Sequence, residues 1–246
     1  MTVKRALAAR KWVKKTGHYI LRTRGLDSAQ MNDPVPEAGD PAVVMDDEPP
    51  NSRKALDRLL QDMIEQPESR LAIAEAIEGQ FGQDRAILIL DMTGFSRTTH
   101  RHGIVAFLLM IHQMQRIACP CIKAHGGVLV KTEADNLFCL FDTVDAALTA
   151  AQDIARRLEL INVVMPADRH LYASIGVGYG RVLNIEDEDL FGDEVNLTCK
   201  LSEDIAEQGA ILVTAEARAR LPQMQGLVEQ EVSISGLSLT YFQLVG

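Results

Sequence analysis

The chain has 246 residues and a formal net charge of −9, with 34 Asp and Glu against 25 Lys and Arg. This length allows one catalytic domain of about 160 residues and leaves about 85 upstream, too few for a second large core. The acidic balance argues against nucleic-acid binding by the main domain. Four cysteines without the spacing of a zinc site indicate a reduced, cytoplasmic protein.

The first 26 residues contain eight Lys or Arg and no acidic residue. This basic arm, residues 1–25, could form an imperfect amphipathic helix that suits an anionic membrane surface or a protein contact, including the acidic body of the chain itself. The sequence has no run of about 20 apolar residues, so we expect no membrane span. We therefore expect a cytoplasmic protein, and we leave open whether the basic arm contacts a membrane surface.

Residues 26–51 are rich in Pro, Asp, Glu and Gly, which is typical of a flexible acidic linker. Two short amphipathic helices are predicted next, over residues 52–83. The first has Ser52 as its N-cap, and the second begins at Pro67. This helical element either packs on the following domain or transmits a dimer or partner signal to it.

The catalytic domain is expected over residues 84–246. Five consecutive apolar residues, 86–90, favour a strand buried on both faces, and Asp91 follows it. Gly94 permits a positive φ, and the neighbouring hydroxyls and backbone N–H groups could face an anion. This phosphate-sized loop comprises Met92, Thr93, Gly94, Phe95 and Ser96. The apolar run 104–111 then predicts a helix that is broken near Pro120.

A hairpin is expected after the turn at Gly126 and Gly127. Strands 128–132 and 137–141 would flank a four-residue loop, which places Asp135 at the tip. If the hairpin pairs antiparallel with the first strand, Asp91 and Asp135 approach each other. Two carboxylates at that position could bind the divalent ions of a two-metal phosphoryl-transfer site.

The remaining pattern completes an α+β fold. The predicted elements are a helix over 144–161, a strand over 171–178, a helix over 194–207, and strands over 210–213, 227–234 and 239–245. The order gives a ferredoxin-like βαββαβ sheet with additional strands and helices. We expect helices on one face of this sheet and the metal site at its edge.

A third motif lies between Asp189 and Leu201, in the sequence DLFGDEVNLTCKL. Together with the segments around Asp91 and Asp135, it resembles the catalytic domain of class III nucleotidyl cyclases, the adenylate and guanylate cyclases. Three separated motifs in the right order are hard to obtain by chance. The resemblance implies that Asp91 and Asp135 hold two divalent ions per site, Mg²⁺ or Mn²⁺, and that the backbone of residues 92–96 binds the triphosphate.

The same resemblance implies that Lys131 and Asp189 read adenine and that Asn196 and Lys200 are catalytic. Asn196 would orient the ribose, while an Asp accepts from the adenine amine and a Lys donates to a ring nitrogen. This pair is typical of an ATP-specific enzyme. The family builds each site between two domains, so the resemblance also implies a head-to-tail homodimer.

Several positions depart from the family pattern. Lys200 stands where a transition-state Arg is usual, Ser174 where another Arg is usual, and Ala134 where a Gly is usual, and residues 232–236 lack a phosphate-binding Lys. Arginine contacts in phosphoryl transfer can contribute about 10³–10⁵ in rate. A catalytically weak or inactive nucleotide-binding or regulatory module is therefore the alternative. A third alternative makes the basic arm a tether and the domain its scaffold.

Overall fold

The computed structural model describes residues 49–93, 95–186, 188–234 and 237–245, and residues from 47 onward form one compact unit. The predicted basic arm and most of the predicted acidic linker lie outside the described residues, as does Gly94. The predicted boundary at residue 83, between the helical element and the catalytic domain, stays a prediction.

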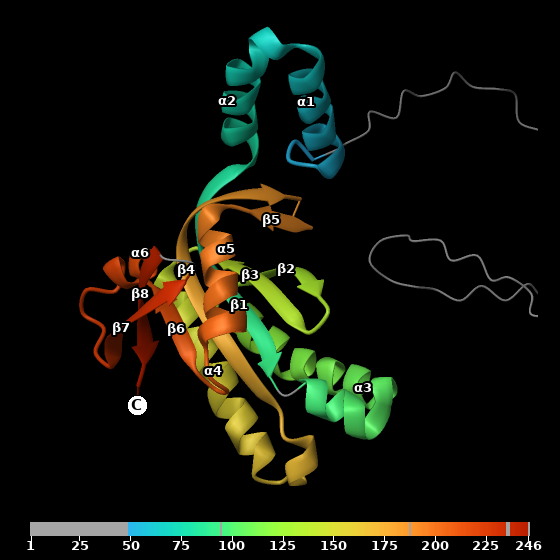
Figure 1. The fold of residues 1–246 in the computed structure, drawn as a ribbon, viewed down its shortest axis with the longest axis vertical. Coiled ribbons are helices and arrows are strands. Elements are labelled where there is room, and N and C mark those ends of the chain that lie inside the picture. Colours follow the sequence, from blue (N-terminus) through green and yellow to red (C-terminus); the bar gives the residue numbers. More distant parts are fainter. Residues whose placement is uncertain (1–48, 94, 187, 235–236, 246) are drawn as a thin grey trace, which may run out of the picture. The chain divides into compact units, whose positions relative to one another are not determined.

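The first described elements form a helical hairpin (Figure 1). Its parts are α1 (Arg53–Glu65), a short 3₁₀ turn η1 (Pro67–Ser69) and α2 (Arg70–Phe81). Ser52 caps α1 as predicted, because its hydroxyl accepts from the Ala55 N–H at 3.1 Å. Leu56, Phe81 and Ile185 are buried together, so the hairpin packs on the long strand β4 that carries Ile185.

The sheet contains β1 (Gly82–Thr93), β2 (Val128–Glu133), β3 (Asn136–Phe141), β4 (Tyr172–Ile185), β5 (Asp189–Phe191), β6 (Ile211–Thr214), β7 (Leu227–Ile234) and β8 (Leu237–Leu244). The strand order is β2-β3-β1-β4-β6-β8-β7, and β5 pairs with β4 beside this path. Only the β4–β6 pairing is parallel among these ladders. The expected α+β architecture is confirmed.

Two of the differences between the predicted and observed strands concern the acidic pair. β1 runs to Thr93, so Asp91 lies inside the strand, opposite Ser174 of β4, rather than after it. Pairing with β4 extends the strand beyond its apolar run. The hairpin turn has two residues rather than four, because Glu133 pairs with Asn136. Ala134 in this turn has φ 52°, in the left-handed region.

The helices are α3 (Phe95–Ala124), α4 (Val144–Asn162), η2 (Ala167–Arg169), α5 (Asp193–Lys200), the π-helical turn η3 (Leu201–Ile205) and α6 (Ala215–Ala219). A break near Pro120 was expected and is wrong. α3 continues through Pro120 to Ala124, while its kink lies at Gly103, which has φ 80°. Buried Ala118 and Ile122 hold the helix against the sheet across the proline.

Helices cover both faces of the sheet, which corrects the expectation of one covered face. Leu88 and Leu90 pack in the core formed with α3 and α4, whereas Ile87 and Ile89 pack with Val195 of α5. Strand alternation produces this division. The approach of α5 needs glycine in β4, because a Cβ at Gly178 would lie 2.0 Å from Thr198 Oγ1.

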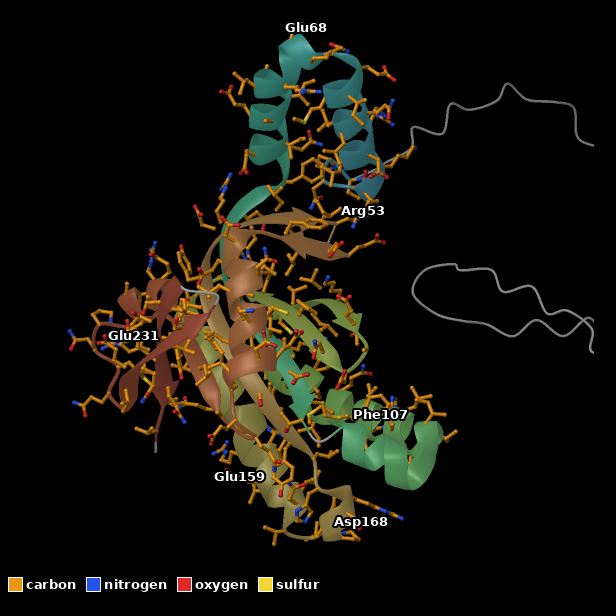
Figure 2. The ribbon with its side chains drawn as sticks, viewed as in Figure 1. Arg53, Glu68, Phe107, Glu159, Asp168 and Glu231 are labelled. Carbon is orange, nitrogen blue, oxygen red and sulfur yellow. The ribbon has the colours of Figure 1, made fainter. Side chains whose placement is uncertain are left out.

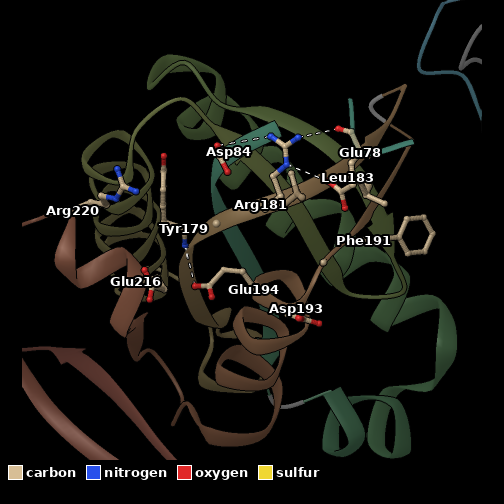
Figure 3. A pocket seen from close by; sticks show the side chains of 13 residues that line it. Glu78, Asp84, Tyr179, Arg181, Leu183, Phe191, Asp193, Glu194, Glu216 and Arg220 are labelled. Carbon is tan, nitrogen blue, oxygen red and sulfur yellow. Dashed lines mark hydrogen bonds and ion pairs between the residues drawn. The ribbon is translucent and has the colours of Figure 1, made fainter. Parts of the chain in front are cut away.

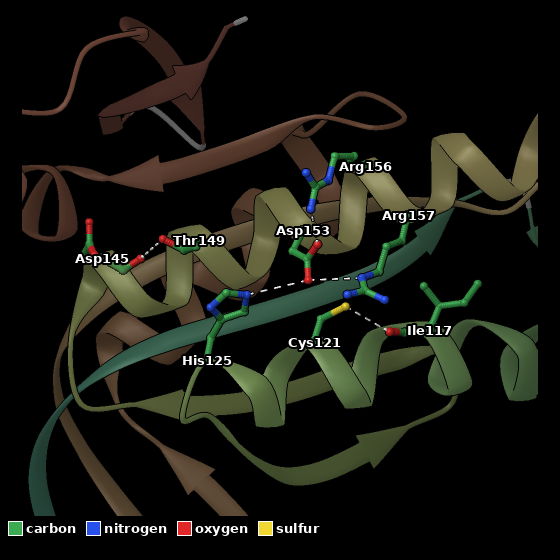
Figure 4. A network of polar contacts seen from close by, with 8 residues as sticks. All are labelled: Ile117, Cys121, His125, Asp145, Thr149, Asp153, Arg156 and Arg157. Atoms are coloured by element: carbon green, nitrogen blue, oxygen red, sulfur yellow. Dashed lines mark hydrogen bonds and ion pairs between the residues drawn. The ribbon is translucent and has the colours of Figure 1, made fainter.

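The α3–α4 layer is also joined by polar contacts (Figure 4). Asp153 of α4 accepts from Arg157 Nε at 3.1 Å and lies 3.7 Å from Nε2 of His125, which follows α3. Residues Gly103–Ala124 of α3 are long and apolar enough to cross a membrane, judged by length and composition only. Phe107 and Met114 in it are buried in the core, which accounts for part of its apolar character.

Candidate active site

Asp91 and Asp135 are brought together by the pairing of β1 with β3. Leu90 lies opposite Leu137, so the turn that carries Asp135 sits at the end of β1 beside Asp91. Burial, followed by the charges of Asp135 and Glu203, raises the pKa of Asp91 from 3.8 to about 6. Burial also raises the pKa of Asp135, against a backbone hydrogen bond that lowers it. Asp135 is therefore near enough for its charge to act on Asp91, while the role of the two carboxylates as metal ligands stays a prediction.

Glu203 is a third carboxylate at this place, and the sequence reasoning did not identify it. It lies in the π-helical turn that follows α5. Its Oε1 accepts from the side-chain amide of Asn136 and from Cys199 Sγ, the latter at 3.0 Å. Residues in a π turn point in other directions than they would in an α-helix. The periodicity of an α-helix alone could therefore not have placed Glu203 here. Such turns are frequent at functional sites.

The acidic cluster fits divalent ions in its chemistry. Carboxylate oxygens are hard ligands, which divalent ions such as Mg²⁺ prefer. The negative charges of these carboxylates repel one another, and a bound cation would neutralise them. Within the described ranges no group of three or more His, Cys, Asp or Glu is placed to hold a metal ion unaided. An ion bound through Asp91 and Asp135 would therefore need further oxygens, such as those of a phosphate chain.

The predicted triphosphate loop corresponds to the junction of β1 and α3. Met92 and Thr93 end the strand, Gly94 is outside the described residues, and Phe95 and Ser96 begin the helix. The Thr93 hydroxyl oxygen is buried and has no hydrogen-bond partner among the described residues. An unsatisfied hydroxyl beside a helix N-terminus is favourable for binding an anion.

Lys131 and Asp189 form a second group. Lys131 Nζ lies 3.0 Å from Asp189 Oδ1 and 3.1 Å from Glu133 Oε2. Burial lowers the pKa of Lys131, but its hydrogen bonds to these two carboxylates raise that pKa overall. Burial raises the pKa of Asp189, whereas hydrogen bonds from Lys131 and Arg53 bring it below its ordinary value. Both side chains are therefore charged at neutral pH.

Different charges act on the two groups, although Cys199 lies within reach of both, because the charges of Glu203 and Lys131 both act on its pKa. The charges that shift the pKa of Asp91 are Asp135 and Glu203, and those that shift Lys131 are Asp189 and Glu133. The acidic pair and the Lys131–Asp189 pair are thus two distinct groups of charged side chains in one chain.

Asn196 and Lys200 lie one turn apart on α5. Asn196 is exposed, and its backbone N–H donates to the Gly192 carbonyl at 3.1 Å. Lys200 Nζ is already paired with Asp204 at 3.1 Å. At the position of the absent arginine, the buried Ser174 hydroxyl donates to the Glu207 carbonyl at 3.0 Å, so this residue serves the packing of β4.

A separate cavity of about 560 Å³ lies between α2, β4 and α6 and contains none of the predicted site residues (Figure 3). Several of its charged side chains already have partners. Arg181 contacts Glu78 at 3.3 Å, the Arg220 guanidinium lies 4.1 Å above the ring of Tyr179, and Glu194 accepts from the Tyr179 N–H at 3.1 Å. We assign it no substrate.

The family model for the adenylate and guanylate cyclase catalytic domain matches residues 79–246. A putative adenylate cyclase 3 from Rhizobium meliloti is 28% identical over 52% of this chain, and the match spans only 22% of that relative. Among solved structures, an adenylate/guanylate cyclase/hydrolase from Silicibacter pomeroyi is 28% identical, with a TM-score of 0.58 over 67% of this chain and 98% of that one. The adenylyl cyclase CyaB from P. aeruginosa is 17% identical with a TM-score of 0.56 over 67% of this chain and 96% of that one, a likeness of fold.

Proposed function

Because this chain belongs to the adenylate and guanylate cyclase catalytic domain family, we propose that it is an adenylate cyclase, which converts ATP to cyclic AMP and pyrophosphate. The observation that carries the choice of ATP is the charged Lys131–Asp189 pair, with its 3.0 Å contact. Adenine offers an amine donor and a ring-nitrogen acceptor, which match an Asp acceptor and a Lys donor. Guanine presents the opposite pattern at the corresponding atoms. A mismatched buried polar contact costs about 1–3 kcal/mol, enough for selection between the two bases.

The other site residues have complementary roles. Asp91 and Asp135 would hold two divalent ions, Mg²⁺ or Mn²⁺, and members of this family generally use divalent metal ions. Such ions lower the pKa of the attacking 3′-hydroxyl and balance charge on the leaving pyrophosphate. Thr93 and the first N–H groups of α3 bind the triphosphate, and Asn196 orients the ribose.

The complete site requires two chains. Each chain carries an acidic half-site at Asp91 and Asp135 and a base-reading half-site at Lys131 and Asp189, and the two have different charged partners. A head-to-tail homodimer places the acidic half of one protomer opposite the base-reading half of its partner and creates two equivalent sites. A monomer would be inactive.

A second candidate is a weak or inactive cyclase-like module that binds nucleotide and regulates a partner. The observation that favours it is the Lys200–Asp204 ion pair of 3.1 Å, which holds the cation expected at the transition state. A lysine also lacks the bidentate geometry of arginine toward phosphate oxygens.

The two candidates are separated by incubating the purified full chain with ATP or GTP and Mn²⁺ and identifying products by mass. Our proposal predicts cyclic AMP with little cyclic GMP. Retained ATP binding without any cyclic product would favour the second candidate. Faster production of cyclic GMP would contradict the role given to Lys131 and Asp189.

A further inference from the structure

Arg53, the first residue of α1, contacts the base-reading half-site from outside the predicted catalytic domain. Its guanidinium NH2 lies 2.7 Å from Asp189 Oδ2, and the guanidinium carbon lies 5.7 Å from the ring centre of Phe191. In Figure 2, Arg53 stands at the end of α1 that is nearest to β5, the strand bearing both partners. No motif pointed to this residue, because its partner is 136 positions away in the sequence.

The start of α1 is held in place by neighbouring contacts. The side-chain amide of Asn51 donates to the Asn184 carbonyl at 3.2 Å, just before the β4–β5 turn. Leu56, one turn into the helix, is buried with Ile185 and Phe81. Arg53 therefore projects from a fixed helix end rather than from a free segment.

The hydrogen-bond capacity of the pair explains what Arg53 does. Asp189 Oδ1 accepts from Lys131 at 3.0 Å and from the Leu190 N–H at 2.9 Å, while among the described residues Oδ2 accepts only from Arg53. An ionised carboxylate has about four acceptor positions, so one position remains on Oδ2. Lys131 uses two of its three donors on Asp189 and Glu133, so one donor is not taken by a carboxylate, and the ammonium lies 4.6 Å from the ring centre of Phe138. One acceptor and one donor are what adenine recognition needs.

We propose that Arg53 is a positioning residue for base selection, which fixes the Asp189 carboxylate so that its remaining acceptor position faces the adenine amine. This inference rests on the proposed function. Without Arg53, the carboxylate is free to rotate and to engage Lys131 through both oxygens, which would use the donor and the acceptor that the base requires. Docking of α1 is thereby coupled to nucleotide selectivity.

A purely structural salt bridge would behave differently. The Arg53 and Asp189 side chains are 41% and 21% exposed. Pairs of this exposure contribute about 0–1 kcal/mol to folding, and such a contribution would not distinguish ATP from GTP. The discriminating readout is therefore selectivity and KM rather than stability.

The test compares Arg53→Ala and Arg53→Lys with Arg58→Ala, an exposed arginine of the same helix that serves as the matched control. For each full-length variant, steady-state kinetics with ATP and GTP and the affinity for a fluorescent ATP analogue are measured. Arg53→Ala should raise KM for ATP about tenfold and lower the ATP-over-GTP ratio of kcat/KM by a similar factor, the effect of losing one charge-assisted hydrogen bond. The kcat at saturating ATP should change less than about threefold.

The Lys variant should recover part of the selectivity, and Arg58→Ala should match the unsubstituted chain. Unchanged or tighter ATP binding in a folded Arg53→Ala variant would overturn the inference, since the arginine would then be neutral or a competitor of the base. If the unsubstituted chain binds ATP more tightly than Arg53→Ala but makes no cyclic AMP, the proposed function alone would be overturned. A chain that binds no ATP would overturn both.

Discussion

Replacing Asp91 with Asn should stabilise the metal-free protein while it abolishes turnover. The pKa of Asp91 is raised from 3.8 to about 6, a difference of about two units. At 1.36 kcal/mol per unit this amounts to about 3 kcal/mol, and solvent screening of the partly buried group reduces it to about 1–2 kcal/mol. The folded state binds the proton of Asp91 more tightly than the unfolded state does. The protonated side chain therefore contributes its full stability below pH 4, and this stability is lost as pH rises through about 6.

Thermal unfolding with a chelator at pH 7.5 measures this effect. Asp91→Asn should raise Tm by about 2–8 °C, the shift expected for 1–2 kcal/mol in a domain of this size. The gain should shrink at pH 5, where Asp91 is already mostly protonated in the folded state. Asp57→Asn, at an exposed position of α1, is the control and should leave Tm unchanged. A lower Tm for Asp91→Asn at pH 7.5 would refute the account of a crowded acidic site.

Other consequences can be checked with the same preparations. Ala134→Gly should raise the free energy of unfolding by about 0.5–1 kcal/mol in urea titrations, since glycine tolerates the φ of 52° at that turn; a loss of stability would contradict the left-handed assignment. Asp204→Asn frees Lys200 from its 3.1 Å ion pair and should raise kcat about two- to fivefold. An unchanged kcat would show that Lys200 does not stabilise the transition state. With Mn²⁺ and ATP, kcat/KM should rise with pH through about 6 and then level off, because the metal-binding form of Asp91 is ionised; a profile that is flat from pH 5 to 8 would argue against that role.

Much of the fold could be predicted because local patterns and tertiary structure agree. The apolar run at the centre of β1, the hairpin after Gly127 and the strand over 227–234 are all present. The family was also predicted correctly from three motifs. In each case the apolar residues and turn residues that define the element lie within it.

The errors have a common physical cause in long-range contacts. Asp91 lies inside β1 because β4 extends the pairing, and α3 passes Pro120 because the sheet holds both sides of it. Glu203 reaches the acidic site through a π turn, and Arg53 reaches Asp189 across 136 residues of sequence. The metal-binding and base-reading assignments of the site residues stay predictions that rest on the family and on this geometry.

The central claim is that two protomers contribute complementary halves to each site. Mixing Asp91→Asn chains, which lack the acidic half, with Asn196→Ala chains, which lack the ribose-binding half, tests it directly. Each variant alone should produce no cyclic AMP, and an equimolar mixture should regain up to about a quarter of the normal rate, since half of the dimers are mixed and each has one complete site. A mixture that stays inactive while the unsubstituted chain turns over ATP would contradict the shared site.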